Sequence, residues 1–278
     1  MSQTTFRTIL HQIAFSHSSP AIVFADFCRM AACSLSMLSR EEEYLEVIRP
    51  YSKEQLQEFS KALALLVQEM ESQPFTDILG PYYLEVASHS SKQARGEFYT
   101  PPEVSELMAR ISIDPRQVIE KGLPITVNEP ACGAGGMVLA IAKLFSPHNL
   151  KCEKSYVDFL RITCQDINPV AMDMCFINTS LWGIPARMVW GNTLHNTVNR
   201  SWKNIHWHRV GEDERIKTNA LLEMFRATED IQTKPEEERR TAKAPKQDAD
   251  EIQIEFDFDL GESPKQSHHP ETDPTLQR

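Results

Sequence analysis

The stretch from Asn128 to Gly136, N-E-P-A-C-G-A-G-G, is the feature of this sequence best suited to binding a ligand. It follows a short β-branched segment and precedes an apolar segment with helical spacing. Glycines let a backbone approach a bound molecule closely, and the first turn of a helix presents N–H groups that lack partners inside the helix. A structural turn between a strand and a helix also needs glycine, so this stretch alone leaves both interpretations open.

Polar side chains also end the next two predicted strands. Asp166 stands in Q-D-I-N-P, and Asn192 stands in G-N-T-L. The carboxyl ends of parallel strands meet at one edge of a sheet, where doubly wound proteins bind nucleotides. A carboxylate there can accept hydrogen bonds from both ribose hydroxyls, and Asn192 can reach an adenine amino group. Three consecutive strand ends of this kind favour a ligand crevice.

A third motif lies upstream, in G-E-F-Y-T-P-P-E-V from Gly96 to Val104. The extended F-Y-T-P part leads into a helix, and Pro102 is compatible with the first helical turn. An aromatic ring and a hydroxyl at this place can cover a bound cofactor. Taken by itself, the motif is equally a simple helix start.

Strands that alternate with helices must position these motifs. The pattern predicts strands over 124–129, 160–167 and 186–190, with helices over 136–145 and 169–182 between them. Such alternation is typical of an α/β fold with a parallel sheet and right-handed crossovers. We predict one more strand over 202–210 and a helix over 216–225.

The segments outside this sheet differ in character. Residues 4–70 predict helices, including an amphipathic one over 21–38 and another that begins with a capping box of Ser52 and Gln55. A short helix follows within 74–87. We therefore expect a helical region over 1–87, a Rossmann-like domain over 88–227 and a disordered acidic tail over 228–278.

Charge and composition bound the function further. The net charge is −10, and residues 228–278 hold 14 acidic against 7 basic residues, so the rest of the chain is nearly balanced. A protein that binds duplex DNA alone usually carries a basic surface, so DNA binding here would need a local patch or a partner subunit. The six cysteines form no C-x-x-C pair, and we expect no metal site. Without a long apolar run or a signal peptide, we expect a cytoplasmic protein with no membrane contact.

Taken together, the motifs resemble adenine-N6 DNA methyltransferases, and most of all the modification subunits of type I restriction systems. The likeness rests on G-E-F-Y-T-P-P-E-V, N-E-P-A-C-G-A-G-G, Q-D-I-N-P and G-I-P-A-R-M-V-W-G-N-T-L, in the order of that family, and on D-I-L-G-P-Y-Y-L-E before them. It implies a methyltransferase sheet, S-adenosylmethionine as cofactor, the exocyclic amine of adenine in DNA as methyl acceptor, and a specificity subunit or other restriction-system subunits as partners.

The resemblance also implies roles for single residues. Asp166 would hold the ribose, Ile167 would pack on the adenine, and Asn192 with Thr193 would face its amino group. The family usually has Asp where Asn192 stands, so adenine selectivity would be altered. The remaining implied cofactor residues are Tyr99, Thr100 and Pro101 along the cofactor, and Glu129, Pro130, Ala131, Cys132, Gly133, Gly135 and Gly136 around its methionine part.

The catalytic element of the family is an Asn/Asp-Pro-Pro-aromatic loop, and it is not found after Leu194. Such a loop offers two acceptors to the adenine amine, whose lone pair is delocalised, and stacks an aromatic ring on the flipped base. The pairs Asn199 with Trp202 and Asn204 with Trp207 have the spacing but no prolines. They are weak candidates for a degenerate loop, and strand residues that pack on the sheet are the simpler interpretation.

Three functions therefore stay open at this point. The chain is a DNA adenine methyltransferase, a non-catalytic module that binds cofactor, DNA or a partner subunit of a restriction or anti-restriction system, or a methyltransferase of RNA or protein, because a fold does not decide its substrate. In the tail, residues 251–260 alternate apolar and acidic side chains. This segment is either a docking peptide that adds a strand to a partner's sheet or a solvated tail.

Overall fold

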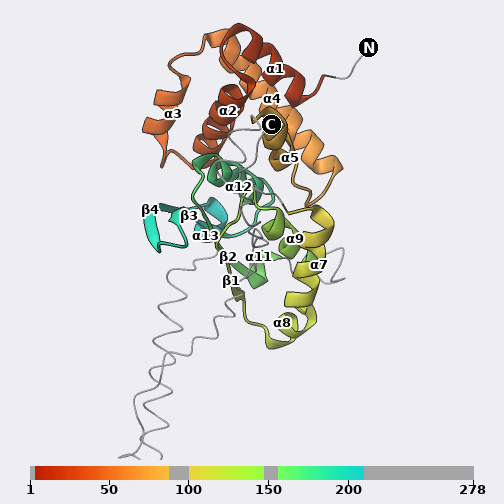
Figure 1. Cartoon of the computed structure of the whole chain (residues 1–278). Helices are drawn as coiled ribbons and strands as arrows, with labels where there is room; N and C mark the ends of the chain where they lie inside the picture. The colour runs from red at the N-terminus through yellow and green to blue at the C-terminus, as the bar shows by residue number, and fades with distance from the viewer. Residues whose placement is uncertain (1–3, 88–99, 147–155, 210–278) are drawn as a thin grey trace, which may run out of the picture.

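The computed structural model describes residues 4–87, 100–146 and 156–209. An N-terminal group of helices lies on one side and a four-stranded sheet on the other, with α12 (Pro169–Leu181) between them (Figure 1). The N-terminal helices are α1 (Phe6–Ser16), α2 (Pro20–Leu35), α3 (Glu41–Ile48), α4 (Lys53–Ser72) and α5 (Leu79–Val86). The tail over 228–278, with its segment 251–260, and the helix predicted over 216–225 lie outside the described residues.

Local capping explains where several N-terminal helices begin. The capping box of Ser52 and Gln55 is present at α4, which confirms that prediction. Thr5 and Thr8 form a similar reciprocal cap at α1. Each cap satisfies N–H groups that the first helical turn leaves free, and is worth about 1 kcal/mol.

The sheet has the strand order β1-β2-β3-β4. Its strands are β1 (Ile125–Glu129), β2 (Leu160–Asp166), β3 (Ala186–Asn192) and β4 (Thr197–Lys203). β1, β2 and β3 are mutually parallel, as predicted, while β4 returns antiparallel to β3. The helices that accompany them are α7 (Pro102–Ser112), α8 (Pro115–Lys121), α9 (Gly136–Leu144), α11 (Tyr156–Phe159) and α13 (Ile205–Arg209). The α/β fold class is therefore confirmed.

The strand predicted over 202–210 is wrong. β4 begins earlier, because a tight turn with Asn196 in the left-handed region reverses the chain directly after β3. It ends at Lys203, because the Oδ1 atom of Asn204 accepts a hydrogen bond from the N–H of Trp207 and starts α13. An Asn side chain that bonds to the backbone a few residues ahead favours a helix start over a continued strand.

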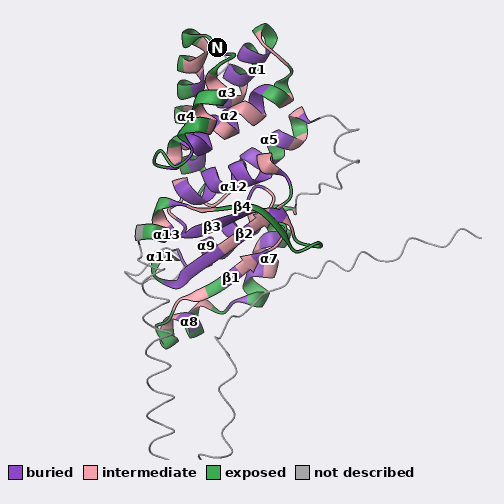
Figure 2. Cartoon of the chain, turned by 90° about the vertical axis from the view of Figure 1, so that its left-hand side faces the viewer, coloured by how far each residue is buried: buried purple, intermediate pink, exposed green. Residues whose placement is uncertain are grey.

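α12 joins the two halves of the molecule. It packs against α2 on one side and against β2 and β3 on the other, and every residue from Ala171 to Ser180 is buried (Figure 2). One continuous hydrophobic core runs from Phe6 in α1 to Met188 in β3. The N-terminal helices therefore share their core with the sheet.

No helix among the described residues is long and apolar enough to cross a membrane.

Candidate functional site

The glycine loop leaves β1 at Glu129 and enters α9 at Gly136. Gly133 and Gly135 have φ values of 52° and 92°, in the region that favours glycine. At Gly135 a Cβ atom would also lie 3.1 Å from the Sγ atom of Cys175. The N–H of Cys132 donates to the carbonyl of Gln165 over 2.9 Å, which anchors the loop on β2. No side chain caps the start of α9, so its first N–H groups face the loop without a side-chain partner.

Asp166, at the carboxyl end of β2, contacts this loop. Its Oδ2 atom accepts a hydrogen bond of 2.9 Å from the N–H of Gly133, and its Oδ1 atom accepts one of 2.8 Å from the N–H of Asn168. Ile167 is 61% exposed beside it, and the carbonyl of Ile167 accepts from the indole of Trp190. The acid and the apolar side chain predicted for one ligand are thus neighbours of the glycine loop.

The end of β3 also meets the loop. The hydroxyl of Thr193 donates a hydrogen bond of 2.6 Å to the carbonyl of Pro130. The Oδ1 atom of Asn192 accepts from the N–H of His195 over 3.1 Å, so this amide holds the turn that leads to β4. Gly191 is required here, because a Cβ atom on it would lie 2.0 Å from the carbonyl oxygen of Thr197. All three predicted strand ends therefore converge at one edge of the sheet.

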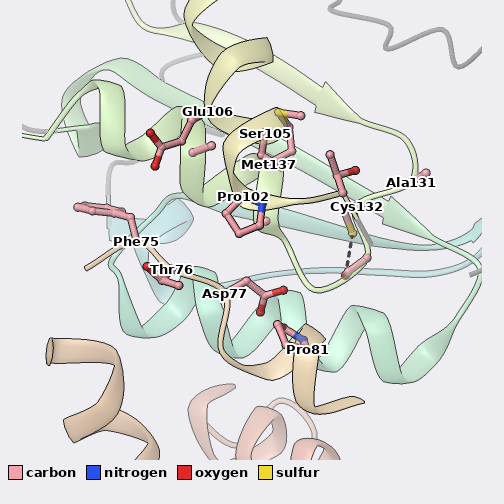
Figure 3. A pocket seen from close by; sticks show the side chains of 14 residues that line it. Phe75, Thr76, Asp77, Pro81, Pro102, Ser105, Glu106, Ala131, Cys132 and Met137 are labelled. Carbon is pink, nitrogen blue, oxygen red and sulfur yellow. Dashed lines mark hydrogen bonds between the residues drawn. The ribbon is translucent and has the colours of Figure 1, made fainter. Parts of the chain in front are cut away.

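A cavity of about 100 Å³ opens between the glycine loop, the start of α7 and the segment before α5 (Figure 3). Five residues predicted to hold the cofactor line it, namely Thr100, Ala131, Cys132, Gly133 and Gly136. Pro101 precedes α7 in an extended conformation, and Tyr99 lies outside the described residues. Asp77 and Ser105 also line the cavity. Sequence reasoning missed both, although D-I-L-G-P was visible as a motif.

Glu129 lies under the loop and is only 5% exposed. Burial raises the pKa of its carboxyl to about 7, and the nearby Cys175 and Asp166 act in the same direction. The N–H of Ala131 donates to it over 3.4 Å and opposes the shift weakly. The carboxyl is therefore close to half protonated at neutral pH.

Asn204 and Trp207 lie at the other end of the sheet. Asn204 is 1% exposed, and its amide accepts from the N–H of Ala186 and donates to the carbonyl of Ile184, at the start of β3. The predicted ligand residues are at the end of β3. Since the strand rises about 3.3 Å per residue, its full length separates this amide from the loop. We do not retain this pair as catalytic candidates.

Asn199 and Trp202, the other candidate pair, have different surroundings in β4. Asn199 is exposed in β4, where it is the unpaired residue of the bulge opposite Trp190 and Gly191. Trp202 contacts the guanidinium groups of Arg40 and Arg200, whose carbon atoms lie 5.2 and 5.7 Å from its ring centre. This packing fixes β4 against the helical region and occupies the ring that a catalytic loop would stack on a base.

Comparison with known proteins decides the family. Residues 75–250 match the family model described as N-6 DNA Methylase, which is more than half of the chain. The chain belongs to the N-6 DNA methylase family. The family predicted from the four motifs is thereby confirmed.

The chain is also similar to individual proteins and solved structures. It is 28% identical over 131 residues to the type I restriction enzyme MpnII methylase subunit of Mycoplasma pneumoniae, covering 45% of this chain and 22% of that one. One similar solved structure is a class I S-adenosylmethionine-dependent methyltransferase of Listeria monocytogenes, with 13% identity and a TM-score of 0.36, covering 69% of this chain and 54% of that one. Another is a modification subunit of a type I restriction enzyme of Vibrio vulnificus, with 20% identity and a TM-score of 0.30, covering 55% of this chain and 27% of that one. The chain thus spans about a fifth of the length of this curated relative.

Proposed function

We propose that this chain binds S-adenosylmethionine at the crevice formed by the glycine loop, Asp166 and the end of β3, and that it serves methyl transfer to the exocyclic amine of adenine in DNA. The observation that carries the proposal is the convergence of three strand ends on one loop, joined by the hydrogen bonds from Gly133 to Asp166 and from Thr193 to Pro130.

The residues present fit this cofactor. The start of α9 has no side-chain cap and offers N–H groups to a carboxylate, as helix N-termini commonly do. Asp166 is placed to accept from ribose hydroxyls, and Ile167 presents an exposed apolar surface to the base. When bound, the cofactor supplies an electrophilic methyl group on its sulfonium. The chain's own residues hold and orient it, and they shield it from water in the cavity.

The methyl acceptor requires a further element. The only Pro-Pro pair in the sequence is Pro101-Pro102, and Asn204 is committed to the backbone at the opposite end of the sheet. In the described sheet β1 pairs with β2 alone. Doubly wound sheets continue from the first strand into a second half, at the point where the ligand binds. We propose that residues outside the described ranges, or a further subunit of a restriction system, supply the groups that bind the methyl-accepting adenine at this edge of the sheet.

A second candidate function follows from the same geometry. With Asn204 and Trp202 both engaged in packing, the chain suits a module that binds cofactor and assembles with other subunits without transferring methyl groups itself. Transfer of a labelled methyl group to unmethylated DNA separates the two. Incorporation by the purified chain, alone or together with the further subunits of a restriction system, supports the enzyme. Cofactor binding with no incorporation under either condition supports the module, and absence of cofactor binding contradicts both.

Gly136→Ala is expected to separate ligand binding from folding. A Cβ atom at this position meets no atom within 4 Å, and alanine favours a helix over glycine, so the free energy of unfolding should be unchanged or raised by up to about 1 kcal/mol. Gly136 lines the cavity, so the added methyl group occupies cofactor space and should weaken binding by about 10-fold. Denaturant unfolding and equilibrium dialysis check the two halves. A variant with wild-type affinity would contradict the placement of the cofactor.

Glu129→Gln is expected to change the pH dependence of stability. Because the pKa of the folded-state carboxyl is about 7 and the unfolded value is near 4.5, the folded state binds more protons between these values. The stability that Glu129 contributes is therefore full below about pH 4.5 and is lost as pH rises through 7. The variant lacks this loss, so its stability advantage over the wild type should grow from pH 5 to pH 8, by up to roughly 3 kcal/mol. Thermal unfolding across this range would contradict the assignment if the two curves stayed parallel.

A further inference from the structure

Asp77 brings a negative charge to the cavity from outside the glycine loop. It lies in the segment before α5, and its carboxyl group faces the cavity opposite Cys132 and Ala131 (Figure 3). The donors to this carboxyl are uncharged amides, namely the N–H of Gly80 at 3.0 Å, the side chain of Asn178 at 3.2 Å and the N–H of Leu79. Burial raises its pKa. Within the described ranges, no cation forms an ion pair with it.

Ser105 supplies a second polar group in the same cavity. The residue is 1% exposed, lies in the second turn of α7 and lines the cavity. Its Oγ atom has no hydrogen-bond partner in the described part of the chain. A buried hydroxyl without a partner costs about 1–3 kcal/mol, so a ligand that completes its bonding is expected at such a place.

Opposite these groups stands the uncapped start of α9, with Gly136 and Met137 at the cavity wall. The cavity is thus anionic on the side of Asp77 and, through the helix N-terminus, favourable to an anion on the other side. This arrangement suits a zwitterion, with an ammonium and a carboxylate on one carbon.

We infer that the Asp77–Ser105 cavity recognises the amino-acid end of the cofactor, with Asp77 binding its α-ammonium, the start of α9 binding its α-carboxylate and Ser105 adding a hydrogen bond. The inference rests on the proposed function. It gives this cavity the role of selecting the cofactor over nucleosides that have no amino-acid end. An ammonium beside Asp77 favours the ionised carboxylate, and so opposes the effect of burial, which raises the pKa of this group.

The competing explanation is that Asp77 only fixes the start of α5. Asp77→Asn tests it, because asparagine keeps an acceptor oxygen for Gly80 and for Asn178 but removes the charge. The full chain and this variant are titrated with S-adenosylhomocysteine, with its deaminated analogue and with 5′-methylthioadenosine. The variant should bind S-adenosylhomocysteine at least about 10-fold more weakly and the two ligands without an ammonium within about twofold of the wild type.

Equal losses for all three ligands would overturn the assignment to the ammonium and leave cofactor binding intact. A wild-type chain that binds none of them would overturn the proposed function together with this inference. A second measurement does not depend on the variant. The wild type should bind S-adenosylhomocysteine at least about 10-fold more tightly than its deaminated analogue, and equal affinities would contradict the role of Asp77.

Discussion

Asp166→Ala is expected to weaken binding of S-adenosylmethionine by about 100-fold, the largest effect of any single change at the site. The carboxylate is placed to hold the ribose, and it also accepts from the N–H of Gly133 and so keeps the glycine loop in shape. Hydrogen bonds to a charged group are worth about 1.5–3 kcal/mol each, so the loss of this group removes enough free energy for two orders of magnitude in affinity. Equilibrium dialysis with labelled cofactor measures it.

Asp114→Ala is the matched control for Asp166. Asp114 is exposed, caps α8 through the N–H of Arg116 and precedes β1 at the edge of the sheet away from the loop. Its replacement should cost some stability and leave cofactor affinity within about twofold. Unchanged binding in Asp166→Ala, with the protein still folded, would remove Asp166 from the site.

Asp173→Ala is expected to lower the free energy of unfolding by about 3–5 kcal/mol, a large effect for a single polar side chain. Asp173 is 1% exposed in α12 and accepts hydrogen bonds from Arg29 at 2.5 Å and Arg40 at 2.9 Å. Glu43 pairs with the same two arginines and neutralises part of their positive charge. Without Asp173, Arg40 stays buried with less compensation, and the N-terminal helices loosen from the sheet. Urea unfolding measures the change.

Two further variants make the Asp173 prediction specific. Glu58→Ala breaks the exposed pair of Glu58 with Lys61 and should cost less than about 1 kcal/mol, because water screens that pair. Asp173→Leu combined with Arg40→Met should cost less than Asp173→Ala alone, since it removes both buried charges. A double variant as unstable as the two single changes added together would show that the ion pair is not the origin of the effect.

The sequence predicted the sheet well because its signals are local. The glycine loop, Asp166 and Asn192 each end a strand with clear β-branched or apolar character, and the parallel order of β1, β2 and β3 follows from the helices between them. The family could be recognised for the same reason, since its motifs are short and occur in a fixed order.

What the sequence did not predict depends on contacts between distant residues. The sequence pattern predicts that Asn204 is a strand residue. In the structure its side-chain oxygen accepts hydrogen bonds from the N–H groups of Ala186 and Trp207, so β4 ends and α13 begins there. Asp77 lies about fifty residues before the glycine loop, and only the packing of its segment against α7 and α9 brings it to the cavity. The partners of Asp173 are likewise more than a hundred residues away, so no local pattern indicates that α12 joins the helices to the sheet.

Equilibrium dialysis of the full chain with methyl-labelled S-adenosylmethionine tests the central claim most directly. The predicted result is one cofactor bound per chain, which S-adenosylhomocysteine displaces. The affinity for the cofactor should be about 100-fold lower in Asp166→Ala. A folded wild-type chain that retains no label at millimolar cofactor would contradict the cofactor site itself.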